Sequence, residues 1–413
     1  MIEGQEKHRE VGTSVELFSG AGGLALAMHE AGFRHLLVNE YAKRACETLL
    51  GNRAVTRKGE DHVPESLDDA WPLVEGDVRG VQFDYLAGQG VDVVAGGPPC
   101  QPFSLGGAHK GTEDERNMFP ELFRVVSTVK PKAVICENVR GLLRPSFRPY
   151  FEYILRELSL PFVTRDPATT WQRHDEQLLD LLATPGEPDS RYVVVPMPVN
   201  AADYGVPQIR NRVIIVAFRA DLGITEEIWR ERFMPKPTHS QAALIRDQRN
   251  GTYWERQKVR AGIRRAFVET LPAAPRDDGL LPWRTLRDAL YGNPDRSHEP
   301  RLPADVVDGA EHPNGRWLHH IGWPGARIYD GHTPNALDRP AKTVKAGVHG
   351  VPGGESVMML DNGQHRYMTV RETARVMTFP DQWRLHGPRG EQMRQLGNAV
   401  PVALGPLFAH AVE

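Results

Sequence analysis

The chain has 413 residues, 40% of them hydrophobic, and its 50 Lys and Arg nearly balance 53 Asp and Glu for a formal net charge of −3. That length exceeds what one compact core usually holds, so we expect a main domain and a smaller one. The net charge excludes a uniformly basic surface, so any positive surface for nucleic acid has to be local.

No apolar run approaches the roughly 20 residues that span a bilayer, so we expect no membrane association. The N-terminus is polar and of mixed charge, which is not typical of a signal peptide. There are three cysteines, Cys46, Cys100 and Cys136, and none forms a CxxC pair. Because the cysteines are few and odd in number, we expect a reducing, cytoplasmic location and not a disulfide scaffold.

The first elements form a compact βαβ unit. Residues 15–18 predict a short strand, residues 19–23 a glycine-rich turn, residues 24–31 a helix and residues 35–38 a second strand. A helix between two strands makes those strands parallel.

Further apolar strands are predicted at residues 92–95, 133–136 and 213–218, and alternating strands and helices indicate a doubly wound α/β sheet. Residues 219–348 are rich in Pro, Gly and Arg with weak periodicity, which indicates a smaller, irregular domain. Residues 370–377 have a helical pattern, and residues 402–412 predict a closing apolar helix.

The turn after the first strand is a candidate cofactor site. Gly20, Gly22 and Gly23 allow a sharp turn and a close approach to a ligand. Glu40 ends the next strand about 20 residues later, where an acidic residue accepts hydrogen bonds from ribose hydroxyls. Asp77 follows a further segment and is placed to bind an adenine amino group. These positions suit an adenosine-containing cofactor and do not by themselves separate NAD from S-adenosylmethionine.

The candidate nucleophile is Cys100, which follows Pro98 and Pro99 after the strand at residues 92–95. Two prolines fix the backbone and present the next side chain rigidly. A lone Cys is more often a small core residue, but the carboxyl end of a strand is where active sites gather.

Other candidates follow neighbouring strands. Glu137 ends the strand at residues 133–136, where a carboxyl beside apolar side chains can donate a proton. Arg210 and Arg212 are two residues apart, so in an extended segment they face the same side and offer forked donors to a carbonyl or a phosphate. A structural carboxylate and solvated surface arginines are the alternatives.

Six motifs in order resemble those of the cytosine-5 DNA methyltransferase family, in its bacterial modification-enzyme form. They comprise a cofactor motif, a nucleophile motif, an acid motif, a paired-arginine motif, a helix after the recognition domain and a last motif that returns to the cofactor. In this sequence they are Phe18-Ser19-Gly20-Ala21-Gly22-Gly23, Pro99-Cys100-Gln101, Glu137-Asn138-Val139, Gln208-Ile209-Arg210-Asn211-Arg212, residues 371–380 and Gly397-Asn398-Ala399-Val400-Pro401.

The resemblance implies a Rossmann-like, S-adenosylmethionine-dependent methyltransferase domain at residues 1–218 plus 349–413 and a target-recognition domain at 219–348. It implies a flipped-out cytosine in double-stranded DNA, attacked by Cys100 with help from Glu137, Arg210 and Arg212. Ser104 and Thr343 would contact DNA. The cofactor would contact Phe18, Gly20, Gly22, Gly23, Glu40, Tyr41, Asp77, Val78, Pro98, Asn398 and Val400.

We expect a monomer on DNA, with a cognate restriction endonuclease in the same cell as a possible partner. The alternatives are an RNA cytosine-5 methyltransferase, a DNA-binding regulator without activity and an NAD-dependent oxidoreductase. No metal site is predicted: His319, His320 and His332 lack ligand spacing and are expected to face solvent or DNA. Residues 165–190 are long for the connection that they make, and they have no assigned role.

Overall fold

The computed structural model describes residues 9–57, 59, 63–99, 117–292, 300–311, 316–328, 330–346 and 356–413. The chain divides into two compact units. The first comprises residues 1–199, 211–235 and 405–413, and the second comprises residues 200–210 and 236–404. Among the described residues, no helix is long and apolar enough to cross a membrane.

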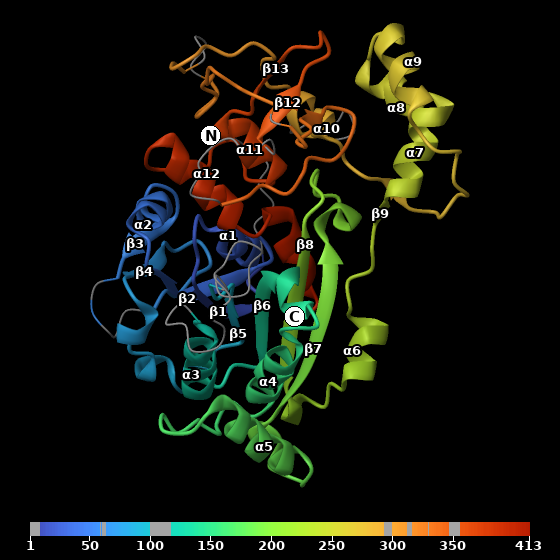
Figure 1. The fold of residues 1–413 in the computed structure, drawn as a ribbon. Coiled ribbons are helices and arrows are strands. Elements are labelled where there is room, and N and C mark those ends of the chain that lie inside the picture. Colours follow the sequence, from blue (N-terminus) through green and yellow to red (C-terminus); the bar gives the residue numbers. More distant parts are fainter. Residues whose placement is uncertain are drawn as a thin grey trace. The chain divides into compact units, whose positions relative to one another are not determined.

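An eight-stranded sheet with strand order β3-β4-β2-β1-β5-β6-β8-β7 forms the centre of the first unit. The neighbours from β3 to β6 are parallel, and β8 runs antiparallel to β6 (Figure 1). The strands are β1 (Gly12–Leu17), β2 (Phe33–Glu40), β3 (Ala54–Thr56), β4 (Trp71–Glu75), β5 (Val93–Gly96), β6 (Ala133–Val139), β7 (Tyr192–Asn200) and β8 (Asn211–Arg219). The predicted βαβ unit, its parallel strands and the α/β class are confirmed.

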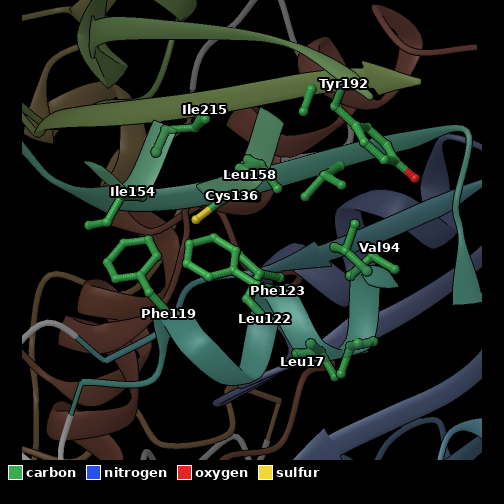
Figure 2. Packing of buried hydrophobic residues seen from close by; sticks show 14 of the residues in the cluster. Leu17, Val94, Phe119, Leu122, Phe123, Cys136, Ile154, Leu158, Tyr192 and Ile215 are labelled. Carbon is green, nitrogen blue, oxygen red and sulfur yellow. The ribbon is translucent and has the colours of Figure 1, made fainter. Parts of the chain in front are cut away.

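One face of this sheet is covered by an apolar layer. Leu17, Val94 and Cys136 point from β1, β5 and β6 toward α3 and α4, and Figure 2 shows the rings of Phe119 and Phe123 turned toward Cys136. The helices of this unit are α1 (Gly23–Glu30), α2 (Lys43–Leu50), α3 (Phe119–Val129), α4 (Arg148–Ser159), α5 (Trp171–Leu182), α6 (Glu226–Arg232) and α13 (Gly405–His410).

The C-terminal helix α13 packs against α1, and a glycine makes this packing possible. A Cβ atom on Gly405 would collide with the Cβ of Ala27, so the two helix backbones approach closely at this point. The prediction of one closing helix over residues 402–412 is wrong in its bounds. Residues Val402–Leu404 form a 3-10 turn, and the α-helix begins only at Gly405.

Residues 165–190, which had no assigned role, contain α5. Trp171 meets the ring of Tyr150 edge-on at 5.3 Å between centroids. Arg156 of α4 pairs with Asp175 of α5 at 2.6 Å. The segment therefore extends the apolar layer outward from α4.

The second unit is built from short elements. Its strands are β9 (His239–Ser240), β10 (Leu281–Pro282), β11 (Asn335–Ala336), β12 (Val357–Met359) and β13 (His365–Tyr367). Its helices are α7 (Gln241–Asn250), α8 (Thr252–Gln257), α9 (Ala261–Glu269), α10 (Leu286–Tyr291), α11 (Val370–Val376) and α12 (Arg389–Asn398). The helix predicted at residues 370–377 is confirmed as α11. Sequence periodicity missed α7 to α10 because helices of six to ten residues span only two or three turns.

The other face of the large sheet contains buried polar groups. Glu16 of β1 is 1% exposed, and burial raises its pKa to about 8. His35 of β2 is buried beside it, and burial lowers the pKa of His35 to about 3. Nδ1 of His35 lies 2.7 Å from the Ser14 hydroxyl, and Nε2 lies 2.9 Å from the Ala25 carbonyl. Both titratable groups are therefore neutral near pH 7.

This cluster predicts a pH-dependent stability. Because folding raises the pKa of Glu16, the folded chain keeps a proton that the unfolded chain loses above about pH 4.5. The free energy of unfolding then falls by up to about 1.4 kcal/mol per pH unit until the folded pKa near 8. Glu16→Gln should remove this loss, so the variant should gain about 2–4 kcal/mol over the wild type at pH 8 and much less at pH 5.

The measurement is urea unfolding of both proteins at the two pH values. His35 is present in both proteins, so its own protonation cancels in the difference. An advantage of the variant that is equal at both pH values would contradict the proposed titration of Glu16.

Candidate active site

The large sheet has a switch point at β1, because β2 lies on one side of β1 and β5 on the other. In open α/β sheets, ligands bind outside the carboxyl ends of the strands at such a point. The turn after β1, Glu40 at the end of β2, Asp77 after β4, Pro98 after β5 and Glu137 in β6 all belong to this edge. The fold thus brings these described residues of the first unit to one edge of the sheet.

The turn after β1 has an unusual backbone. Phe18, Gly20 and Gly22 all have positive φ angles, of 55°, 55° and 87°. For Phe18 this conformation is costly, and Gly adopts it without penalty. Gly22 is the N-cap of α1, and no atom lies within 4 Å of the position that a Cβ on Gly20 would take. The turn therefore leaves open space beside Gly20, whereas Gly22 and Gly23 at the start of α1 are buried.

Two side chains at the end of β2 fix this turn. Glu40 accepts hydrogen bonds from the backbone N–H groups of Gly20 and Ala42, both at 2.6 Å. The amide of Asn39 donates to the carbonyls of Val74 and Gly76. Together these hydrogen bonds tie the ends of β1, β2 and β4 to one another. Asn39 was not predicted as a site residue, although it precedes Glu40 directly.

The remaining predicted cofactor residues of this unit differ in exposure. The Tyr41 side chain is 76% exposed, whereas Val78 and Pro98 are buried. Asp77 is paired with Arg79, whose Nη2 lies 2.5 Å from Oδ2. Hydrogen bonds from Arg79 lower the pKa of Asp77, so its carboxylate is ionised and held in one orientation.

Glu137 and Arg212 form an ion pair at the carboxyl end of β6. Nε of Arg212 lies 2.6 Å from Oε1 of Glu137, and the two side chains are only 11% and 10% exposed. The antiparallel register explains the contact: Val139 opposes Arg212 and Glu137 opposes Ile214, so Glu137 and Arg212 are diagonal neighbours on one face.

The chain after β5 approaches this pair. A Cβ on Gly97 would lie 3.4 Å from a carboxylate oxygen of Glu137. The amide of Asn138 donates to the carbonyl of Pro98 at 3.1 Å. The segment that leads to Cys100 is thus tied to β6. Asn138 is the second positioning residue that sequence reasoning missed, and its signal was its place within the acid motif.

Cys100 and Ser104 lie outside the described residues. The other two cysteines are buried: Cys136 lies in the apolar layer, and Cys46 donates to the carbonyl of Glu40 at 3.3 Å. Burial raises the pKa of the Cys46 thiol to about 12. A thiol needs its thiolate form to act as a nucleophile, so Cys46 is unsuited to that role.

Arg210 belongs to the second unit, and the boundary between the units follows it directly. It is 1% exposed. Nη1 donates to the carbonyl of Val344 at 3.1 Å, and Nη2 donates to those of Gly397 and Ala399, both at 2.9 Å. Its guanidinium therefore holds three backbone segments of the second unit together, one of which is the predicted last motif.

The other predicted residues of this unit lie along the same segments. The Thr343 hydroxyl donates to the carbonyl of Ile209 at 2.7 Å. Asn398 ends α12 and is exposed, and Val400 is 7% exposed. A Cβ on Gly397 would overlap the backbone of Lys345, so only glycine permits this packing.

The histidines differ from the prediction. His320 is fully buried, with Nδ1 at 3.0 Å from the Thr369 hydroxyl and Nε2 at 3.1 Å from the Pro303 carbonyl. His319 is half-buried, and its Nε2 accepts from the backbone of Leu385. The expectation that these two face solvent or DNA is wrong, because His320 lies between Thr369 and Pro303 and His319 lies between Leu385 and Gln392. His332 is exposed. Within the described part of the chain, no cluster of three His, Cys, Asp or Glu is placed to hold a metal.

The first unit thus has a Rossmann-like α/β sheet, with Glu40 at the end of β2 and the Glu137–Arg212 pair between β6 and β8. Solved structures with this fold include a DNA modification methyltransferase encoded within an E. coli prophage. It is 20% identical and covers 97% of both chains with a TM-score of 0.58. The S. pombe Dnmt2 methyltransferase is 12% identical and covers 96% of both, with a TM-score of 0.51.

The chain belongs to the C-5 cytosine-specific DNA methylase family, whose model matches residues 12–160 and 173–412. It is similar to the Type II methyltransferase M.Eco47II of Escherichia coli, with 32% identity over 97% of this chain and 79% of the relative. M.NgoMIV of Neisseria gonorrhoeae is 30% identical over 97% of this chain and 95% of the relative. The chain is therefore a DNA (cytosine-5) methyltransferase that uses a methyl-donor cofactor.

The contacts of Arg210 predict that replacing its side chain lowers the unfolding free energy of the protein. Arg210→Met keeps an apolar stem of similar length but leaves three buried carbonyls without their donor. We expect a loss of about 3–5 kcal/mol in unfolding free energy, measured by urea unfolding of the full chain. Arg173→Met is the control, because Arg173 is 77% exposed and should change stability by less than about 0.5 kcal/mol. Equal stabilities of the two variants would contradict the structural role.

Proposed function

We propose that the enzyme transfers a methyl group from S-adenosylmethionine to C5 of a flipped-out cytosine in a specific duplex DNA sequence, through a covalent adduct between Cys100 and C6. The Glu137–Arg212 pair carries this proposal, because it lies beside the segment that leads to Cys100. Cytosine N3 and O2 are neighbours on one edge of the ring. A carboxyl and a guanidinium in contact match that edge.

The residues after β1 and β2 fit an adenosine-containing cofactor. Gly20 leaves open space at its Cβ position, and the exposed ring of Tyr41 is available to stack on adenine. Glu40 is oriented by two backbone N–H groups, and a carboxylate offers about four acceptor positions, which is compatible with ribose hydroxyls as further donors. Asp77 would bind the adenine amino group, with Arg79 fixing its orientation. S-adenosylmethionine, when bound, supplies an electrophilic methyl group.

The S-adenosylmethionine contacts assigned to Phe18, Gly22, Gly23, Val78, Pro98, Asn398 and Val400 are carried from the family motifs into the same proposal. Phe18, Gly22 and Gly23 form the turn, and Pro98 is held by Asn138. In this proposal the glycines of the turn can offer only backbone atoms to the cofactor, whereas Glu40, Tyr41 and Asp77 offer side chains.

Cys100 acts as the nucleophile in this mechanism. Its thiolate attacks C6 and breaks the aromaticity of the ring, which makes C5 electron-rich. Protonated Glu137 donates to N3 and neutralises the charge that develops there, and Arg212 holds O2. After C5 is methylated, C5 loses its proton to solvent, N3 returns its proton to Glu137, and expulsion of the Cys100 thiolate restores the aromatic ring. The burial of Cys46 and Cys136 supports the choice of Cys100.

A stacked cytosine cannot reach such a site, so the base has to leave the helix at a cost of a few kcal/mol. Ser104 and the target-recognition domain at residues 219–348 would stabilise the extrahelical state, and Thr343 would contact a phosphate. Residues 1–218 plus 349–413 form the catalytic domain in this proposal. Arg210 takes part as a positioning residue through its carbonyl contacts.

The relatives are named as Type II methyltransferases, which supports a role in a restriction-modification system. We propose that the enzyme works in the cytoplasm as a monomer on DNA, and that a cognate restriction endonuclease recognises the same sequence. The two described cysteines are not joined in a disulfide, which is compatible with a reducing compartment.

Replacement of the nucleophile tests the covalent step. Cys100→Ser should lower methyl transfer by about 10³-fold or more, because an alcohol is a far weaker nucleophile than a thiolate. Binding of cofactor and of duplex DNA should be kept. The measurement is transfer of labelled methyl groups to duplex DNA, with tRNA as a parallel substrate and Cys46→Ser as the control. Near-normal turnover of Cys100→Ser would refute the adduct, and methylation of tRNA alone would refute the DNA substrate.

Glu137→Gln tests the proton donor. The variant should fold and bind cofactor normally, and kcat should fall by about 10²–10⁴-fold, which is the range for loss of general acid catalysis. Arg173→Gln is the matched control, because Arg173 lies on α5 and pairs with an exposed acid. Single-turnover kinetics separate the chemical step from product release. A rate for Glu137→Gln within a factor of two of the wild type would remove Glu137 from the mechanism.

A further inference from the structure

Four cations lie close together at the junction of α8 and α9 in the second unit. They are Lys258, Arg260, Arg264 and Arg265, here called the basic surface. Lys258, Arg260 and Arg265 are exposed and Arg264 is half-exposed. Among the residues that the structure describes, none of the four has an acidic partner or a side-chain hydrogen bond, so their charge faces solvent.

The neighbouring arginines are used differently. Arg246 pairs with Asp277 at 2.5 Å, and Arg256 lies 3.5 Å from Asp288. Arg249 donates to the carbonyls of Leu271 and Pro272. These three cations therefore make contacts within the unit. The basic surface consists of neighbouring cations that make no such contact with the described residues.

The apolar side of α9 fixes the basic surface in place. The ring of Phe267 meets Trp254 of α8 edge-on at 5.5 Å between centroids. The guanidinium of Arg339 lies 5.5 Å from the centroid of the Phe267 ring. Trp254 belongs to a small core with Leu244, Tyr253 and Trp283. The basic side chains thus project from a packed module.

Two of these cations are placed where positive charge does not favour the fold. Arg260 is the N-cap of α9, where the helix dipole disfavours positive charge. Arg260 and Arg264 are one turn apart, and like charges at that spacing destabilise a helix. Lys258, in contrast, is the C-cap of α8, where a cation is favourable. The two costs at Arg260 and Arg264 indicate that the positive charge on α9 is kept for an anionic partner.

We propose that the basic surface contacts the phosphate backbone of duplex DNA and does not read base sequence. Lys and Arg form charge-assisted hydrogen bonds with phosphate oxygens, and such contacts position a protein on DNA without specifying sequence. The inference rests on the proposed duplex DNA substrate. It assigns a sequence-independent part of the affinity to α8 and α9, separate from Thr343 and from any base contacts.

The test uses the full chain with Lys258, Arg260, Arg264 and Arg265 all changed to Gln. Binding of a duplex that carries the target and of an unrelated duplex is measured between about 50 and 200 mM NaCl. Each lost phosphate contact should reduce the slope of log K against log salt by about 0.9, so we expect a reduction of about 2–4. Affinity at about 100 mM salt should fall roughly 10–100-fold for both duplexes.

Arg148→Gln with Arg173→Gln is the control, because both arginines are exposed on the first unit and their removal also makes the net charge more negative. This control should keep the wild-type slope. In the fourfold variant cofactor binding should stay unchanged, and the thermal midpoint should stay the same or rise because unfavourable charge is removed from α9. Both results show that the variant folds. Arg264→Gln with Arg265→Gln is the smaller variant if the fourfold change impairs folding.

The outcomes separate this inference from the proposed function. An unchanged salt slope in a fourfold variant that still methylates DNA would overturn the inference and leave the proposed function intact. A loss confined to the target duplex would also overturn it, because it would show base readout. Failure of the wild type to methylate any duplex would refute the proposed function itself.

Discussion

The hydrogen bonds that Glu40 accepts from Gly20 and Ala42 are the constraint on which the candidate site depends. A parallel sheet brings the carboxyl ends of its strands to one edge, but it does not fix the turns that follow them. Glu40 joins the turn after β1 to the end of β2, and Asn39 adds the end of β4. Phe18 and Gly20 can keep their positive φ angles because these contacts hold the turn.

The paired-arginine motif shows how one short segment serves two purposes. The unit boundary passes between Arg210 and Asn211, so neighbouring arginines of one motif belong to different packed bodies. Arg210 satisfies carbonyls of Val344, Gly397 and Ala399, which would otherwise be buried without donors. Arg212 lies in β8 and reaches Glu137 because of the antiparallel register. A planar guanidinium with several donors suits both tasks, and Lys would suit neither.

Much of the first unit was predictable because its signals are local. Apolar strands, a glycine turn and the acidic end of β2 lie within a few residues of one another, and the parallel register of β1 and β2 follows from the helix between them. The partners of Arg210 lie 134 to 189 residues away, and no periodicity reports such contacts. The burial of His320 was not predictable for the same reason, because its partner Thr369 is 49 residues away in the sequence. The short helices α7 to α10 were not predicted, because six to ten residues give too few turns for a helical periodicity in the sequence.

The affinity of the chain for DNA depends on where its charges lie and on whether they are paired. With 50 basic and 53 acidic residues, the formal net charge of −3 gives no attraction to DNA over the whole chain. Many arginines are already engaged, as Arg287 is with Asp338 and Asp361, or Arg371 with three carbonyls. Such cations contribute little field outside the protein, because a partner charge or dipole compensates each one. Affinity for a polyanion must then come from cations that the fold leaves uncompensated, so the pairing of each arginine says more about DNA binding than the net charge does.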